Sequence, residues 1–253
     1  EKGKGHFPVI ETAAFLLPII ERQSGISLRP SVLIIAPTRE LAQQIDEQFR
    51  EFSRGLNLYS ALVVGGMNVE RQIRELKRRP HLIIGTPGRL KDLMQRRAVQ
   101  LSNMTTLVLD EADRMLDMGF LPDIRQIVDE MPRERQTLFF SATITPEIQA
   151  LVNTFLTGPV TVSVRTSETG GRVEQGVVET RDKHHKVEVL TEMLQGDAYD
   201  KVLVFGETKF GVQRLSDHLD NSGIPSVAIH GNKNQAQRTK ALKAFKDNRV
   251  RVM

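Results

Sequence analysis

The sequence predicts an α/β fold in two domains, each with a parallel sheet flanked by helices, with the second domain incomplete. Short runs of apolar, often β-branched residues alternate with helical patterns, which is typical of βαβ units. The runs are short and continuous, as in parallel strands that are buried on both faces of a sheet. The alternation pauses once, at residues 165–172 (RTSETGGR), which contain two glycines and no apolar residue and are expected to form a linker.

The first domain is expected to span residues 1–164, and its first predicted helix is Ala13–Ile20. Five apolar runs predict strands at Val32–Ala36, Tyr59–Val64, His81–Ile84, Thr106–Leu109 and Thr137–Phe140. Helical patterns follow these runs from Thr38 onward, over Val69–Arg78, over Arg89–Arg97, after Asp110 and from Pro146. A helix after each strand is the connection that a parallel sheet needs.

The second domain is expected to span residues 173–253. Its predicted strands are Val173–Val178, Val202–Phe205, Ser226–Ile229 and Arg249–Met253. Its predicted helices are Lys186–Leu194, Phe210–Leu219 and Gln235–Phe245. A domain of about 80 residues is near the lower size limit for an independent core, and no element follows the last predicted strand. We therefore expect this domain to be incomplete.

The composition excludes some classes of protein and leaves others open. The sequence has no cysteine, which rules out disulfides and thiolate metal sites. Its longest apolar run, Ala13–Ile20, is too short to span a bilayer, so we expect no membrane partner and a cytoplasmic location. With 35 Lys and Arg against 31 Asp and Glu, the net charge of +4 permits a polyanionic partner. The chain has no Trp and only two Tyr, so a nucleic acid would be held mainly by its backbone.

Polar motifs follow the predicted strands of the first domain at their carboxyl ends, where open α/β sheets bind ligands. The sharpest is Asp110–Asp113 (DEAD), directly after Thr106–Leu109. An apolar strand that ends in Asp-Glu is typical of ATPases, in which carboxylates hold Mg²⁺ through oxygen ligands and polarise the attacking water. The structural alternative is an ordinary helix start, because acidic residues favour the first turn of a helix.

Further motifs accompany DEAD along the chain. They are Ala36–Ala42 (APTRELA), Gly65–Gly66, Thr86–Arg89 (TPGR), Arg114–Phe120 (RMLDMGF), Ser141–Thr143 (SAT), Val202–Lys209 (VLVFGETK) and His230–Arg238 (HGNKNQAQR). With DEAD, they resemble the DEAD-box RNA helicases of superfamily 2, in their bacterial style, across almost the whole chain. The resemblance implies two RecA-like domains, ATP and Mg²⁺ as cofactors, and single-stranded or locally duplex RNA as the partner.

The resemblance also implies roles at the nucleotide site. Glu111 and Asp110 would be catalytic and would hold Mg²⁺, partly through water. The residues that would bind ATP, or couple its site to the RNA site, are Thr12, Asp113, Ser141 and Thr143. The two hydroxyl residues of SAT would do so through hydrogen bonds to DEAD.

For RNA, the resemblance implies contacts from both domains. In the first domain these would come from Pro37, Thr38, Arg39, Gly65, Gly66, Thr86, Pro87, Gly88 and Arg89. In the second they would come from Gly206, Thr208, Lys209, His230, Gly231, Gln235 and Arg238. A capping threonine leaves helix N–H groups facing an anion, an arginine adds charge, and paired glycines allow a backbone to approach closely. The structural alternatives are plain helix caps, a strand-ending turn and exposed helix termini.

One part of the family pattern is absent. A glycine-rich phosphate-binding loop ending in Gly-Lys-Thr should precede the helix Ala13–Ile20, but residues 5–12 read GHFPVIET, with Glu11 at the lysine position. Either the loop is deleted, or about 20 further residues belong between Ile10 and Thr12 to complete a βα unit. The Q motif, motif V and the arginine finger of motif VI are also not recognisable. We therefore expect the chain itself to be nearly inactive in ATP hydrolysis.

Three functions fit these features. The leading one is an ATP-dependent RNA helicase that separates strands locally by bending one of them. The second is an ATP-independent RNA-binding module derived from a helicase, which the absent loop favours. The third is a DNA helicase or translocase of the same superfamily, against which the combination of DEAD, SAT and TPGR argues.

Overall fold

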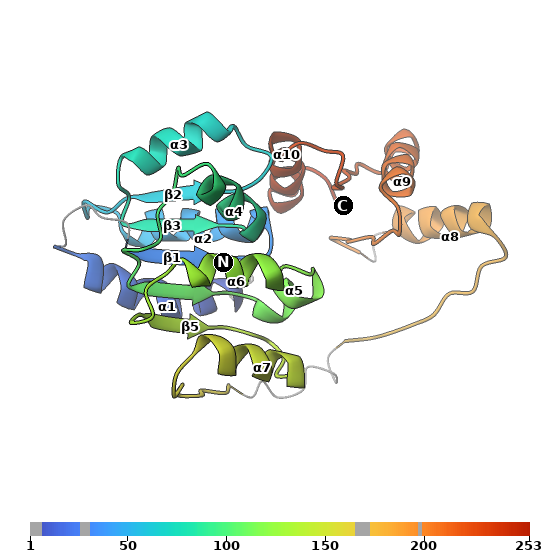
Figure 1. Ribbon diagram of the computed structural model, residues 1–253. Helices are drawn as coiled ribbons and strands as arrows, with labels where there is room; N and C mark the ends of the chain where they lie inside the picture. Colours follow the sequence, from blue (N-terminus) through green and yellow to red (C-terminus); the bar gives the residue numbers. More distant parts are fainter. Residues whose placement is uncertain (1–6, 26–30, 165–172, 197–198) are drawn as a thin grey trace. The chain divides into compact units, whose positions relative to one another are not determined.

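The computed structural model describes residues 7–25, 31–164, 173–196 and 199–253 (Figure 1). The chain forms two compact units, Glu1–Thr161 and Val162–Met253. The predicted linker at residues 165–172 lies outside the described residues. Among the residues that are described, no helix has the length and apolar character needed to cross a membrane.

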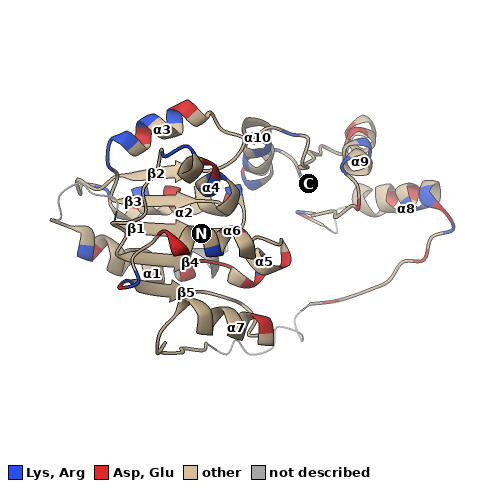
Figure 2. Ribbon diagram, in the orientation of Figure 1, with Lys and Arg blue, Asp and Glu red and all other residues tan. Residues whose placement is uncertain are grey.

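A five-stranded parallel sheet organises the first unit, and none of its strands carries a charged residue (Figure 2). The strands are β1 (Val32–Ile35), β2 (Ser60–Val63), β3 (Leu82–Gly85), β4 (Thr106–Leu109) and β5 (Gln136–Phe139). Their order in the sheet is β2-β3-β1-β4-β5, and every neighbouring pair is parallel. The five strands predicted for this unit are present, each within one residue of the expected ends.

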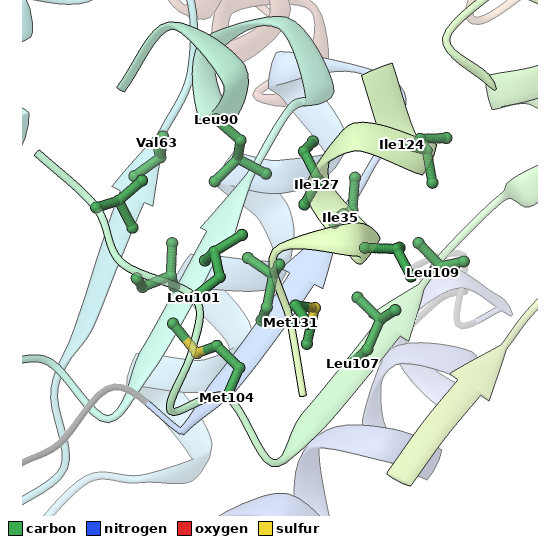
Figure 3. Close-up of a cluster of buried hydrophobic side chains, with 14 of the residues drawn as sticks. Ile35, Val63, Leu90, Leu101, Met104, Leu107, Leu109, Ile124, Ile127 and Met131 are labelled. Atoms are coloured by element: carbon green, nitrogen blue, oxygen red, sulfur yellow. The ribbon is translucent and has the colours of Figure 1, made fainter. Parts of the chain in front are cut away.

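Helices connect the strands and cover both faces of the sheet. They are α1 (Phe7–Gln23), α2 (Arg39–Phe52), α3 (Val69–Lys77), α4 (Pro87–Gln95), α5 (Ala112–Asp117), α6 (Leu121–Asp129) and α7 (Pro146–Phe155). Side chains alternate between the faces along each strand. In β1, Ile34 joins a cluster with α1 and α2, whereas Leu33 and Ile35 join a cluster with α4 and α6. Figure 3 shows part of the latter cluster, with Ile35 and Leu109 from the strands and Ile127 from α6.

In the described part of the second unit, the regular secondary structure is helical apart from isolated bridges. Its helices are α8 (Lys183–Gln195), α9 (Lys209–Asn221) and α10 (Gln235–Lys246), and each contains the helix predicted there. A small buried core joins Leu194 of α8 and Leu219 of α9 to Ile224 and Val252. This core is much smaller than either cluster of the first unit.

The strands predicted for the second unit are the main correction. Residues 173–178 form no strand and lie exposed in an irregular segment, so that prediction is wrong. The other three predicted strands reduce to single bridges, which join Val252 to Val202 and to Ser226. The physical reason is the small core, because strands depend on side-chain packing more than on intrinsic propensity. Phe205, the last residue of the predicted strand Val202–Phe205, is 92% exposed.

Candidate functional site

The carboxyl ends of the five parallel strands bring the predicted motifs of the first unit to one edge of the sheet. Thr38 follows β1, Gly65 follows β2, Thr86 follows β3, Asp110 follows β4 and Ser141 follows β5. Backbone hydrogen bonds continue the ladder into these loops. The Asp110 amide donates to the Ile35 carbonyl at 3.0 Å, and the Thr86 amide donates to the Val63 carbonyl at 3.0 Å. We call this side of the sheet, defined by the five residues above, the motif edge.

Arg39 packs against the glycine pair at the motif edge. Thr38 is the N-cap of α2, and its hydroxyl accepts a hydrogen bond from the Leu41 amide at 3.2 Å. Pro37, just before the cap, is buried. The Arg39 guanidinium follows, and a Cβ on Gly65 would lie 3.0 Å from its Nη2.

Two features distinguish Gly66. A Cβ at this position would displace the end of the Arg39 guanidinium, which lies against the glycine. The backbone φ of Gly66 is +76°, in the left-handed region that favours glycine. The turn therefore places an exposed glycine directly beside a cation.

Gln72 holds this glycine turn, and sequence reasoning missed it. The side chain is 2% exposed and bonds to both backbone groups of Val64. The Val64 amide donates to Oε1 and Nε2 donates to the Val64 carbonyl, each at 3.1 Å, while Nε2 also lies 3.4 Å from the Met67 carbonyl. The signal that could have identified it is a polar residue on the buried face of α3, between Val69 and Leu76.

The TPGR motif begins α4 without a side-chain cap. Thr86 occupies the N-cap position and Pro87 the first helical position, but the Thr86 side chain makes no capping hydrogen bond. The predicted capping role of Thr86 is therefore wrong. Proline already presets the first turn, and Thr86 is only 9% exposed. Gly88 is exposed, with nothing within 4 Å of a Cβ built there.

Arg89 contacts the backbone directly after the glycine turn. Its Nη1 donates to the Met67 carbonyl at 3.3 Å, and its Nε lies 3.5 Å from Oδ2 of Asp92. Its side chain is 16% exposed, so the contacts hold it against the protein. The motif edge thus carries two arginines, Arg39 and Arg89, around one glycine turn.

Asp110 is a buried carboxyl group with acidic neighbours. It is 7% exposed, and its Oδ1 accepts a hydrogen bond from the Glu111 amide at 3.1 Å. Burial, followed by the negative charges of Glu111 and Glu11, raises the pKa of Asp110 to about 6. The hydrogen bond from the Glu111 amide acts in the opposite direction but is outweighed. Near neutral pH this carboxyl group holds a proton more readily than an exposed aspartate does.

Glu111 has a left-handed backbone, with φ 50° and ψ 53°, at the N-cap of α5. For a residue other than glycine this conformation costs on the order of 1–3 kcal/mol, and such strain is concentrated at functional sites. The Glu111 side chain is 41% exposed and pairs with Arg114 at 3.2 Å. The two acids therefore differ, since Glu111 faces solvent and Asp110 is buried.

Asp113 joins the DEAD loop to the SAT loop. Thr143 donates to Oδ2 of Asp113 from both its amide and its hydroxyl, each at 3.0 Å. The Ser141 hydroxyl donates to the Thr143 carbonyl at 2.7 Å. Burial disfavours the charged form of Asp113, but hydrogen bonds from Thr143 and from the Arg114 amide outweigh it and lower its pKa. If one of these loops moves, it must therefore either break the hydrogen bonds or move the other loop with it.

The segment before β1 does not suit a triphosphate. Helix α1 runs from Phe7 to Gln23 and covers the positions where a phosphate-binding loop would lie. Thr12 is buried in this helix, with 3% exposure. Glu11, at the lysine position, is near enough to Asp110 to raise its pKa. A carboxylate there repels phosphate, and backbone N–H groups that bond within a helix cannot cradle it.

The oxygen donors of Asp110 and Glu111 are of the kind that suits Mg²⁺, which accepts one or two carboxylates and keeps several waters. Across the described ranges, no group of three or more His, Asp or Glu side chains is arranged to hold a metal ion. The carboxyl groups therefore fit a metal that is bound partly through water, whereas the segment before β1 does not fit ATP.

In the second unit, the residues of VLVFGETK gather at the start of α9. Thr208 is its N-cap and uses its side chain to cap the helix. Lys209 Nζ donates to Oδ1 of Asn232 at 3.0 Å, which ties this helix start to the loop before α10. A Cβ on Gly206 would lie 2.7 Å from Cγ2 of Val212, so the chain passes close to α9 there.

The residues of HGNKNQAQR lie in the same unit, around the start of α10. His230 Nε2 is 3.0 Å from Oε1 of Gln213 on α9. Gln235, at the first position of α10, is 7% exposed, while Gly231 is exposed and Arg238 is half-buried. The structure thus brings the predicted second-unit residues together across the starts of α9 and α10.

Comparison with known protein families gives two matches. Residues 12–151 match the DEAD/DEAH box helicase family, and residues 185–253 match the helicase conserved C-terminal domain. The chain is 42% identical over 244 residues to the ATP-dependent RNA helicase CshA of Listeria monocytogenes and 39% identical to the DEAD-box ATP-dependent RNA helicase CshA of Bacillus subtilis. These alignments cover 96% of the chain and 47% and 49% of the relatives, so the chain spans about half the length of the curated relatives it matches.

Two solved structures illustrate the similarity in fold. A structure of S. cerevisiae Dbp5 bound to RNA and ADP BeF3 is 26% identical, with a TM-score of 0.77, over 96% of this chain and 61% of that one. A DEAD box protein from the hyperthermophile Methanococcus jannaschii is 32% identical, with a TM-score of 0.57, over 96% of this chain and 65% of that one.

Proposed function

Because the chain belongs to the DEAD/DEAH box helicase family, we propose that it is the core of an ATP-dependent RNA helicase that grips one RNA strand and separates a short duplex locally. The motif edge carries this proposal. There the DEAD, SAT and TPGR residues and the glycine turn lie at the carboxyl ends of one parallel sheet. In open α/β sheets this is the edge that binds ligands.

The surroundings of the glycine turn support an RNA-backbone site. Arg39 and Arg89 border the turn, and a guanidinium matches phosphate geometry well. Gly65 and Gly66 leave room for a sugar-phosphate chain, and the start of α2 after Thr38 adds N–H groups that favour an anion. Such contacts carry no base code, so the proposed partner is single-stranded or locally duplex RNA of any sequence.

The second unit would complete the grip through the loops at the starts of α9 and α10. By this proposal the domains are residues 1–164 and 173–253, joined by a linker at 165–172. The similarity to a yeast protein whose structure is described as bound to RNA and ADP BeF3 supports RNA and a nucleotide as ligands. A cytoplasmic location belongs to the same proposal.

The nucleotide half of the proposal concerns the family's chemistry, in which ATP with Mg²⁺ supplies the free energy. Asp110 and Glu111 would hold the metal partly through water, and the accessible Glu111 is the better placed of the two to polarise a water. The hydrogen bonds from Thr143 to Asp113 support a coupling role for SAT. The chain with Glu11 in the lysine position would not turn ATP over.

Nucleotide-binding calorimetry tests this half directly. The 253-residue chain is expected to show no heat of Mg-ATP binding. A variant in which residues 5–11 are replaced by a strand and a glycine-rich loop ending in Gly-Lys should bind Mg-ATP and hydrolyse it when RNA is present. In that background Glu111→Gln should abolish RNA-stimulated hydrolysis and leave RNA binding unchanged. Undiminished turnover in the Glu111→Gln variant would refute the role of Glu111.

A second candidate function is an ATP-independent RNA-binding module derived from a helicase. The observation that favours it is α1, which covers the phosphate-loop positions and carries Glu11 beside Asp110. The two functions differ in one measurement, because only the helicase should gain nucleotide binding when the loop is restored. If the restored variant binds RNA but never ATP, the second function is the correct one.

The RNA half is tested by competition between single-stranded RNA and DNA of the same sequence. We expect RNA to bind more tightly, since a DNA translocase would show no such preference. Arg39→Gln and Arg89→Gln should each weaken RNA binding, whereas Arg50→Gln, which removes an exposed arginine paired with Asp46, should not. Equal losses from all three variants would mean that only net charge matters.

A further inference from the structure

The first unit has a second polar surface, on the side of the sheet opposite to the motif edge. A hollow of about 480 Å³ lies at the amino ends of β3 and β4, between the end of α3 and the segment that follows α4. Its lining residues are Leu76, Lys77, Arg79, Ile83, Arg97, Ala98, Val99, Gln100 and Asn103. We call this the basic hollow.

The charges of the basic hollow are all positive. Lys77, Arg79 and Arg97 line it, all three are exposed, and no acidic residue is among its lining. Within the described ranges, none of the three forms an ion pair. Figure 2 shows basic residues gathered at the end of α3 that leads into β3. Asparagine and glutamine in the same lining add hydrogen-bonding groups without opposing the charge.

The adjoining hollow, unlike the basic hollow, has acidic residues in its lining. That space, of about 640 Å³, shares Arg97, Val99 and Gln100 with the basic hollow and is also lined by Asp129 and Glu130. An anion would therefore be drawn to the α3 side, where the cations have no acidic neighbour in the lining, rather than to the α6 side.

Two of the three cations sit on an unusual backbone. Arg79 has φ 52° and Arg97 has φ 54°, each just after the end of a helix. Glycine is the common residue at this place because the left-handed conformation strains other residues. The chain itself uses Gly119 after α5 and Gly223 after α9, with φ of 74° and 79°. Glycine would therefore relieve the backbone strain after both α3 and α4. The chain instead has arginine at both places, around the same hollow, which indicates that the two side chains serve another purpose.

We propose that the basic hollow binds the sugar-phosphate backbone of a second stretch of the RNA held at the motif edge. This rests on the proposed function, because it presumes that RNA is the partner. Three unpaired cations around a hollow without acids favour a chain of phosphates. The polar lining suits ribose hydroxyls, and the absence of aromatic residues from the lining argues against base stacking. Long RNA would thus cross from one edge of the first unit to the other.

The left-handed backbone makes an unusually clean test. The double variant Arg79→Gly, Arg97→Gly removes two charges and places at both positions the residue that the backbone favours. The matched control is Arg71→Gln, Arg96→Gln, which removes one charge from α3 and one from the residue that caps the end of α4. Both control arginines are paired, Arg71 with Glu75 and Arg96 with Asp92, and neither lines the hollow.

Binding of the 253-residue chain is measured by fluorescence anisotropy over a series of salt concentrations. The probes are single-stranded RNAs of about 8 and about 40 nucleotides, the shorter being sized for one site. The glycine variant should bind the long RNA roughly tenfold more weakly, with the salt slope reduced by about 1.4. It should bind the short RNA like the parent and unfold in urea at the same or a higher concentration. The control variant should resemble the parent with both RNAs.

Three results would overturn the proposal. In the first, the glycine variant keeps the parent's affinity and salt slope for long RNA. In the second, the control variant loses as much affinity as the glycine variant, so that only net charge matters. In the third, the glycine variant unfolds at a lower urea concentration, which would assign the cations to stabilising helix ends. A different result would contradict the proposed function itself. If the motif edge did not bind RNA, Arg39→Gln would leave the affinity for short RNA unchanged.

Discussion

Thr143 holds Asp113 with two hydrogen bonds, one from its amide and one from its hydroxyl, both to Oδ2 at 3.0 Å. This contact crosses from the loop after β5 to the start of α5, which follows β4. It lies at the motif edge of the first unit. Because the DEAD and SAT motifs are 30 residues apart in sequence, the tertiary fold creates their contact.

Thr143→Val should weaken this contact while keeping the shape of the side chain. We expect a loss of about 0.5–1.5 kcal/mol in the free energy of unfolding at pH 7, as for one hydrogen bond. The pKa of Asp113 is lowered in the folded chain, so its contribution is present above the ordinary aspartate pKa and disappears as pH falls through the folded value. Urea unfolding at pH 7 and pH 2.5 measures the difference between variant and parent.

Thr143→Ser is the matched control, since serine keeps the hydroxyl and should retain most of the stability. A Thr143→Val variant that is destabilised equally at both pH values would show that packing, not the carboxylate bond, is responsible.

Asp110→Asn should stabilise the chain at high pH. The folded pKa of Asp110 is about 6, above the value of about 3.9 for an exposed aspartate, so folding disfavours its charged form. The parent should therefore be most stable below the unfolded pKa and lose stability as pH rises between these two values. Asparagine has no charge, and we expect a gain of up to about 3 kcal/mol at pH 8 and almost none at pH 4. Urea unfolding at the two pH values measures it.

Asp117→Asn provides the comparison for this prediction, because Asp117 is exposed on α5. Its substitution should change stability by less than about 0.5 kcal/mol at either pH. A constant gain for Asp110→Asn from pH 4 to pH 8 would contradict the raised pKa.

Gly66→Ala should disturb the proposed RNA site as well as the backbone. Gly66 and Gly55 have similar backbones, with φ of +76° and +84°, but only Gly66 has Arg39 against it. Each substitution should cost roughly 1–2 kcal/mol through left-handed strain. Only Gly66→Ala should also displace the Arg39 side chain and weaken RNA binding several-fold. Fluorescence anisotropy with short RNA compares the two variants. Equal affinities would show that Arg39 and the glycine turn do not take part in RNA binding.

Gln72→Leu should release the glycine turn. Leucine is apolar and cannot bond to the Val64 amide and carbonyl, which would be left without their partner. We expect a loss on the order of 2–4 kcal/mol in unfolding free energy. RNA affinity should fall even at low temperature, where the variant remains folded.

The control for Gln72 is Gln149→Leu, on the exposed face of α7, where the side chain bonds to Asn153. It should leave both stability and RNA binding nearly unchanged. If Gln72→Leu loses stability but binds RNA like the parent, Gln72 supports the fold and not the site.

The first unit was the easier half to predict, and the reason is burial. Each strand is a run without charged residues, and in β1 the residues Leu33, Ile34 and Ile35 are fully buried. Such apolar runs are enough to predict buried strands. The second unit shows the limit of this reasoning. The run at 202–205 (VLVF) has the same apolar character, but few partners cover it, and Phe205 stays exposed. The run at 173–178 (VEQGVV) is only half apolar, and its valines are exposed as well. A strand needs neighbours, and a local pattern does not say whether they exist.

The site shows the same division. Motif spacing placed Thr38, Thr86 and Asp110 at strand ends, because helices and strands follow from nearest-neighbour patterns in the chain. The contact of Gln72 with Val64 and the effect of Glu11 on Asp110 could not be predicted in that way. The hydrogen bonds between the Gln72 side chain and the Val64 backbone depend on how α3 packs against β2. The influence of Glu11 on the pKa of Asp110 depends on the packing of α1 beside β4.

The order of strands and helices along the first unit, and the family motifs at the ends of its strands, could be predicted from the amino-acid sequence alone. These follow from short-range burial patterns and from residue types that need no partner to be recognised. Which side chains come together depends on the folded chain: Thr143 contacts Asp113, Arg39 contacts Gly66, and Arg79 and Arg97 line the same hollow. Such contacts join residues far apart in the chain, and their geometry is set when parallel strands align in register and bring distant loops to the same edge.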